Sequence, residues 1–204
     1  MEKRKTIIAA VILLLVFIVG GAIAYFTDKY EVTNTFTIGD VEIEVLEPAW
    51  VSTGSAEAVH MMPGETAQKD PQIHNKSETN PAYVFMKIDG PCSTGENDTE
   101  VRELFPYTAD TTHWYLLTEN PVCDNGNIER LYAYGTSSAM ATLAVDATTE
   151  ALFTYVTLNT AVDGSETGLD DVAMLITGYA IQKEGVTQTD PAEIWDTYFD
   201  DNNS

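Results

Sequence analysis

The side chains best suited to bind a transition metal or to transfer a proton are three histidines, His60, His74 and His113. Their spacing matches neither the His-Glu-x-x-His pattern of zinc peptidases nor another zinc-binding pattern. The chain also lacks the Gly-x-Ser-x-Gly elbow of serine hydrolases, a phosphate-binding loop and a dinucleotide fingerprint. We therefore identify no catalytic residue and do not expect an enzyme.

Carboxylates are the second group that could do chemistry, since Ca²⁺ prefers oxygen ligands. One acidic loop contains four such side chains, Asp163, Glu166, Asp170 and Asp171, and a second loop contains Asp124 and Asn125. Neither loop has the register of an EF-hand. We therefore expect these charges to face water and keep the protein soluble, and no cofactor to be bound; Ca²⁺ is the alternative that the two loops leave open.

The two cysteines, Cys92 and Cys123, lie in the body of the chain. In an exported protein an even pair is a candidate for one disulfide, which would close a loop of about 30 residues. The alternative is two thiols that never meet, because sequence alone does not bring their Cα atoms into bonding range.

The amino terminus has the plan of a secretory signal peptide. A basic head of Lys3, Arg4 and Lys5 precedes a charge-free apolar run that extends from residue 6 to residue 27. Small residues at Ala22 and Ala24 favour cleavage before Tyr25, so we expect 1–24 to be removed. The alternative is an uncleaved membrane anchor, which would be the only contact with a membrane. In both cases the remainder is exported and is secreted or held at the cell surface.

The expected mature part, 25–204, has 180 residues, a size that suits one domain with a substantial core. The whole chain carries a net charge of −22, and residues 1–24 carry +2, which leaves −24 for the mature part. Phosphate groups would be repelled, so nucleic acid and anionic lipid surfaces are excluded as partners through simple attraction.

A strand is expected directly after the cleavage site. There Val32, Asn34, Phe36 and Ile38 alternate with polar residues, which is the two-residue period of a strand with one face toward a core. After cleavage this strand would lie almost at a free amino terminus. It can then pair with its own sheet or with the sheet of a neighbouring molecule.

The rest of the chain predicts an all-β fold. The segment 83–88 is apolar on both faces, as a central strand requires, and Asp124-Asn125-Gly126-Asn127 is typical of a hairpin turn. Residues 49–62 are expected to form a loop, and residues 101–104 a helical turn. Asp190 and Pro191 begin a helix over 190–200. We expect an antiparallel, jelly-roll-like β-sandwich with a short C-terminal helix and an N-terminal hydrophobic signal helix.

Several short stretches together resemble the TasA/camelysin family, in its clostridial type with a SipW-dependent signal peptide. They are Ala-Tyr-Phe-Thr-Asp at 24–28, Asn-Thr-Phe-Thr-Ile-Gly-Asp-Val at 34–41, Pro-Gly-Glu at 63–65, Lys-Asp-Pro at 69–71 with Asn75, Ala-Tyr-Val-Phe-Met-Lys-Ile at 82–88 and Tyr-Ala-Ile-Gln at 179–182. The resemblance implies processing by a SipW-type signal peptidase, a jelly-roll domain and self-association into extracellular fibres of a biofilm matrix.

In such fibres the amino-terminal segment of one subunit completes the sheet of the next, and the segment at this family position is 25–38. The alternative is that the strand belongs to the sheet of its own molecule. Camelysin relatives are also called metallopeptidases, but no zinc motif in this sequence supports that activity. A monomeric surface-binding module, with a cation as its ligand, is the remaining alternative.

Overall fold

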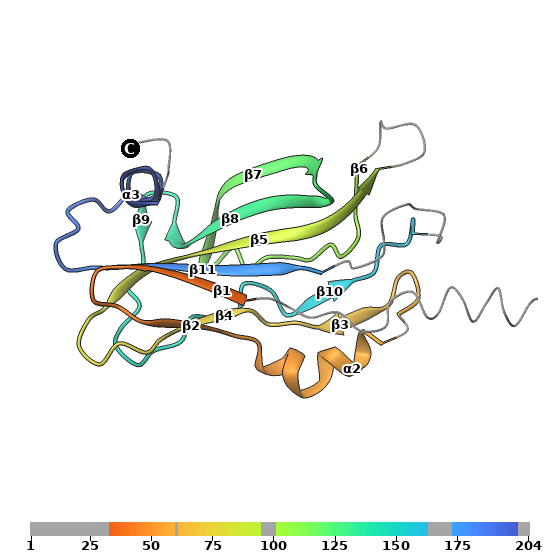
Figure 1. Ribbon diagram of the computed structural model, residues 1–204, viewed down its shortest axis with the longest axis horizontal. Coiled ribbons are helices and arrows are strands. Elements are labelled where there is room, and N and C mark those ends of the chain that lie inside the picture. The colour runs from red at the N-terminus through yellow and green to blue at the C-terminus, as the bar shows by residue number, and fades with distance from the viewer. Residues whose placement is uncertain (1–32, 60, 95–100, 163–172, 200–204) are drawn as a thin grey trace, which may run out of the picture.

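The computed structural model describes residues 33–59, 61–94, 101–162 and 173–199. Its largest element is a seven-stranded sheet, which lies in the upper half of Figure 1. Five strands form the path of this sheet, and one further strand pairs with each of β5 and β8. In spatial order the path is β1 (Thr33–Ile38), β11 (Leu175–Gln182), β5 (Ala82–Thr94), β8 (Asn127–Thr136) and β7 (Trp114–Asp124); β6 (Val101–Glu103) pairs with β5 and β9 (Ala139–Met140) with β8.

Two short antiparallel sheets form the opposite layer, below the main sheet in Figure 1. One pairs β2 (Ile43–Leu46) with β4 (Gln72–Asn75), and the other pairs β3 (Thr66–Gln68) with β10 (Tyr155–Thr157). The helical segments are the π-helix η2 (Trp50–Gly54), α2 (Ser55–Glu57) and α3 (Pro191–Tyr198). The predicted all-β, jelly-roll-like sandwich with a short C-terminal helix is therefore confirmed. The predicted signal helix lies outside the described residues.

Strand β5 explains why the main sheet has an apolar core on both faces. Val84, Met86 and Ile88 are fully buried between the two layers, whereas Phe85 is fully buried on the other face, under α3. Successive side chains of a strand point to opposite faces, so a strand buried on both sides reads as a continuous apolar run. The apolar pattern of 83–88, which only Lys87 interrupts, has this structural cause.

Helix α3 begins where the sequence predicts it. The side-chain oxygen Oδ1 of Asp190 accepts hydrogen bonds from the backbone N–H groups of Ala192 (2.9 Å) and Glu193 (3.3 Å), and Pro191 occupies the first turn. This N-cap satisfies two donors that would otherwise lack partners. The helix ends at Tyr198, slightly before the predicted end at residue 200.

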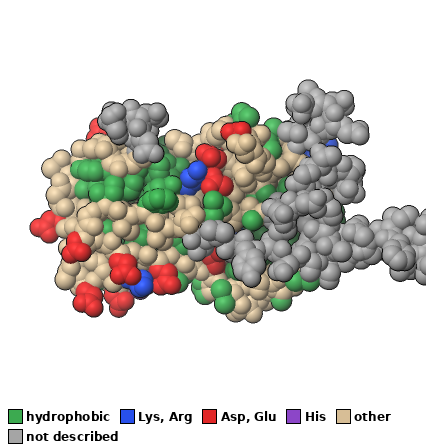
Figure 2. Space-filling model, viewed as in Figure 1, with side chains coloured by type: hydrophobic (Ala, Val, Ile, Leu, Met, Phe, Trp, Pro, Cys, Tyr) green, Lys and Arg blue, Asp and Glu red, His purple; other side chains and the backbone are tan. Residues whose placement is uncertain are grey.

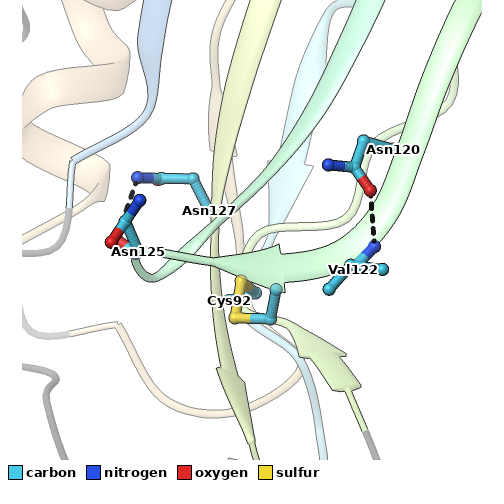
Figure 3. The surroundings of a disulfide bond; sticks show 6 residues. Cys92, Asn120, Val122, Asn125 and Asn127 are labelled. Atoms are coloured by element: carbon cyan, nitrogen blue, oxygen red, sulfur yellow. Dashed lines mark hydrogen bonds between the residues drawn. A yellow bond between two sulfur atoms is a disulfide. The ribbon is translucent and has the colours of Figure 1, made fainter.

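A disulfide joins Cys92 of β5 to Cys123 of β7, with the two Cα atoms 5.9 Å apart (Figure 3). The bond lies beside the tight turn between β7 and β8, where Asn125 and Gly126 have φ values of 49° and 82°. Positive φ at both central residues is the signature of a type I′ hairpin turn, which Asn-Gly favours. The backbone N–H of Cys92 also donates to the carbonyl oxygen of Gly126 (2.8 Å), so the hairpin tip is tied to β5 by two links.

A buried ionisable pair supports the layer opposite the main sheet. Lys69 Nζ lies 2.7 Å from Glu47 Oε1, with side chains that are 2% and 5% exposed, and 4.6 Å from the centre of the Trp50 ring. Burial raises the pKa of Glu47 to about 8 and lowers the pKa of Lys69 to about 7, because both charged forms lose their hydration. The neighbouring Asp70 accepts a hydrogen bond from the backbone N–H of Ala49 (2.8 Å) and so fixes the start of the helical segment.

The structure corrects four details of the sequence-based description. Residues 101–103 form strand β6, where a helical turn was predicted, and the predicted loop 49–62 contains η2 and α2. The aromatic and β-branched residues of 151–158 predict a strand over that whole segment, whereas the structure has only the short strand β10 there. The predicted sandwich was antiparallel, and the main sheet is antiparallel except for β1, which runs parallel to β11. Each difference depends on contacts between segments that are distant in the sequence.

Candidate functional site: an exposed edge strand

Strand β1 forms one edge of the main sheet and pairs only with β11 among the described strands. The register runs in parallel from Thr33 opposite Ile176 to Ile38 opposite Ile181. Three of the four residues predicted to face a core on a donor strand, Asn34, Phe36 and Ile38, lie on β1. The fourth, Val32, lies outside the described residues, as do the predicted cleavage residues Ala22, Ala24 and Tyr25.

The side chains of β1 contribute little to the core. Asn34, Thr35, Phe36 and Thr37 are all exposed, and only Ile38 is half-buried. Phe36 exposes 55% of its surface, whereas Phe85 on β5 exposes none. Elements with few buried apolar contacts open at a low free-energy cost compared with core strands. Strand β1 is therefore held mainly by its backbone pairing with β11.

One aromatic contact anchors β1 to the outer face of the sheet. The ring of Phe36 stacks on Tyr179 of β11 with centroids 5.3 Å apart, and Tyr179 in turn packs edge-on against Trp195 of α3 (4.9 Å). Figure 2 shows that apolar side chains gather on this part of the surface, next to α3. Phe36 is thus the exposed outer end of a chain of rings that leads through Tyr179 to Trp195.

Strand β11, which receives β1, is itself firmly placed. Gly178 lies so close to β2 that an added Cβ would meet the side chain of Val45 at 2.9 Å and that of Ile43 at 3.2 Å. On its other edge β11 pairs with β5 over its whole length, from Leu175 to Gln182. If β1 were absent, β11 would remain in place and expose a row of unpaired backbone groups, which is a template for another strand.

The histidines that the structure describes are engaged in local contacts. His74 Nδ1 lies 3.0 Å from Thr148 Oγ1, and His113 Nδ1 lies 2.6 Å from Asp110 Oδ2. The hydrogen bond to Asp110 raises the pKa of His113 above its ordinary value of 6.5, and the same bond lowers the pKa of Asp110 below 3.8. His60 lies outside the described residues.

The His113–Asp110 pair gives a testable pH dependence. Because the pKa of His113 is raised, protonated His113 stabilises the fold fully below pH 6.5, and this stabilisation is lost as the pH rises through the raised pKa. Because the pKa of Asp110 is lowered, ionised Asp110 stabilises the fold fully above pH 3.8, and this stabilisation is lost as the pH falls through the lowered pKa. We expect Asp110→Asn to lower the pKa of His113, measured by NMR titration of its ring protons. Asp146→Asn, which alters the neighbour of His74, should leave the pKa of His113 unchanged. An unaltered His113 titration in Asp110→Asn would contradict the assignment.

Comparison with known protein families shows to which family the chain belongs. The family described as camelysin metallo-endopeptidase matches residues 2–104, about half of the chain. The chain belongs to the camelysin family. No curated protein and no solved structure matches it. The camelysin match ends within the main sheet, at β6, and includes β1, both strands of the β2–β4 sheet and all of β5.

The metal that the camelysin description implies finds no fitting ligands in the part of the chain that the structure describes. There, no three side chains of the types His, Cys, Asp and Glu lie close enough together to hold an ion. The calcium candidates Asp163, Glu166, Asp170 and Asp171 lie outside the described residues. The other candidate pair, Asp124 and Asn125, belongs to the hairpin turn of β7 and β8.

Two features of this site were not predicted from the sequence. The ring chain from Phe36 to Trp195 joins positions 36, 179 and 195, and no local pattern connects positions so far apart. The parallel direction of β1 was also missed, because alternation predicts a strand but not its neighbour.

Within the described residues, no helix has the length and apolar character needed to cross a bilayer.

Proposed function

We propose that this camelysin-family chain is an exported structural protein of the cell surface or biofilm matrix, and that its subunits assemble into fibres by donating β1 to the β11 edge of a neighbour. The observation that carries the proposal is the exposure of β1: Asn34 to Thr37 are all exposed, and among the described strands β1 pairs with β11 alone. Exchange of an identical strand between copies would break and re-form the same contacts, which makes it a low-cost route to assembly.

The composition supports the same assignment. Export is expected from the signal-like amino terminus, and a large negative charge keeps free subunits soluble until they pair. The SipW-type signal peptidase is the processing partner that we propose, because removal of 1–24 would free the segment in front of β1. No ligand or cofactor is required for this assembly.

The decisive experiment compares two purified chains. The first begins at Tyr25 and contains every described residue; the second begins at Asp40 and lacks β1. We expect filaments of the first chain in negative-stain electron microscopy and only monomers of the second in sedimentation. Addition of a synthetic 25–38 peptide should produce a stoichiometric complex with the second chain, because it restores a partner for β11. If the chains that begin at Tyr25 and at Asp40 both stay monomeric over a range of salt and pH, the proposal is contradicted.

A second function is favoured only by the family description, which names a metallo-endopeptidase. The same purified chain from Tyr25 can be incubated with a general protein substrate, with and without a chelator. Cleavage that is abolished by the chelator would support the peptidase activity. A chain that neither cleaves nor assembles would leave the monomeric binding module, with its acidic loops as the contact surface.

A further inference from the structure

The connection between β1 and β2 is held in place by a group of polar contacts that we call the hinge clamp, formed by Asp40, Asn80 and Gln182. The backbone N–H of Asp40 donates to Gln182 Oε1 (3.0 Å), and Asn80 Nδ2 donates to the carbonyl oxygen of Asp40 (2.7 Å). Gln182 Nε2 also donates to Asn80 Oδ1 (3.4 Å). The two side chains therefore bind Asp40 at its N–H and at its C=O, and contact each other.

The rest of the hinge is shaped to fit this clamp. Gly39 has a φ of +86°, and an added Cβ would lie 2.9 Å from Cβ of Gln182. A non-glycine residue would therefore be strained in this turn both by its backbone angle and by contact. Asn80 is fixed in turn, since its backbone N–H donates to Ser77 Oγ (3.1 Å) and its carbonyl oxygen accepts from Asn75 Nδ2 (3.0 Å).

The clamp is specific to a strand folded back on its own subunit. Val41, the residue after the clamp, is 7% exposed and belongs to the core of its own subunit, so the chain stays anchored there when β1 leaves. To reach a neighbour, residues 39 and 40 must open the left-handed turn and extend away from Gln182 and Asn80. The two hydrogen bonds to Asp40 are then lost, whereas the pairing of β1 with a β11 strand is regained on the neighbour.

We propose that the hinge clamp holds β1 on its own subunit and thereby restrains strand donation, so that the described conformation is a self-paired resting state. This inference rests on the proposed function for its consequence, but the clamp itself can be tested in the monomer. Loss of hydrogen bonds at Asp40 raises the population of molecules in which β1 is detached, without altering the contacts between β1 and β11.

The test uses the chain from Tyr25 with Gln182→Ala or Gly39→Ala, and with Gln188→Ala as a matched control. Gln188 is another half-buried glutamine, but its Oε1 accepts a hydrogen bond from Thr187 Oγ1 (3.4 Å) in the loop before α3. We expect amide hydrogen exchange of residues 33–38 in dilute monomer to become about fivefold to tenfold faster in the first two variants. Exchange in β5 should not change, and Gln188→Ala should resemble the parent.

Assembly kinetics give the second readout. The lag before filaments appear, followed by light scattering, should shorten in Gln182→Ala and Gly39→Ala but not in Gln188→Ala. Unchanged exchange of β1 in both hinge variants, or an equal effect of Gln188→Ala, would overturn the clamp. If no chain forms filaments while β1 exchanges faster in the hinge variants, the clamp holds as a strand restraint, and both its role in donation and the proposed function are rejected.

Discussion

Replacement of Lys69 by Met is expected to lower the free energy of unfolding by about 3–5 kcal/mol, because it leaves the Glu47 carboxyl buried without its partner. Glu47 Oε1 lies 2.7 Å from Lys69 Nζ in the parent, and both side chains are almost fully covered. Methionine is about as long as lysine and is apolar, so it fills the space of the Lys69 side chain. The loss in the free energy of unfolding would therefore report the missing amine and not a cavity. Chemical denaturation followed by circular dichroism measures it.

The pH dependence of this loss has a defined sign. Burial already raises the pKa of Glu47 to about 8 from its ordinary value of 4.5, so the folded state prefers the protonated carboxyl. The penalty for burying Glu47 is absent below the unfolded pKa and grows as pH rises toward the folded pKa. We therefore expect the deficit of Lys69→Met to be smaller at pH 5 than at pH 8.

Two further variants separate the pair from a general charge effect. Glu47→Leu combined with Lys69→Met should recover most of the lost stability, since a buried pair can often be replaced by apolar residues at little cost. Lys76→Met removes the partner of Glu42 in an exposed pair (3.0 Å) and should leave the free energy of unfolding nearly unchanged, because water and salt screen exposed charges. A Lys69→Met variant as stable as Lys76→Met would refute the structural role of the buried pair.

Replacement of Phe85 by Ala is the second large expected effect, a loss of about 3–5 kcal/mol in the free energy of unfolding. Phe85 exposes none of its surface and contacts the rings of Trp195 (5.3 Å) and Phe199 (5.7 Å). Removal of its ring would leave a cavity between the main sheet and α3. Thermal unfolding and the fluorescence of Trp195 would both report the loss of this packing.

Phe36→Ala is the matched control, because it deletes the same side chain at an exposed position of the same sheet. We expect it to cost about 1 kcal/mol or less, the range of a single exposed ring stack. If the two phenylalanine variants lost similar stability, either α3 would not cover Phe85 or β1 would be held far more firmly than its exposure indicates.

Local sequence patterns were sufficient for the elements whose cause is local. The apolar run around Phe85 indicated a central strand, Asn125-Gly126 indicated a hairpin turn, and Asp190 before Pro191 indicated the start of a helix. In each of these cases a few adjacent residues contain the physical reason, whether it is burial on both faces, positive φ or an N-cap.

Elements with a distant cause were missed. Strand β6 pairs with Cys92 to Thr94, and Arg130 of β8 lies between Glu103 of β6 and Glu119 of β7, so its conformation is set by segments that a local helical pattern does not contain. The helical segment that begins at Trp50 likewise depends on the side chain of Asp70, which accepts its N–H (3.4 Å). The candidate site was predicted as a strand at residues 25–38, but its parallel neighbour was not.

Donation of β1 to the β11 edge of the next subunit gives any fibre built in this way a direction. Each subunit has one strand to give and one edge to fill, and the two are different surfaces, so the growing ends of the fibre cannot be equivalent. One terminus presents a bare β11, and the other presents a β1 with no acceptor. A chain that begins at Asp40 would consequently dock at a single terminus and stop elongation there, as a one-sided cap.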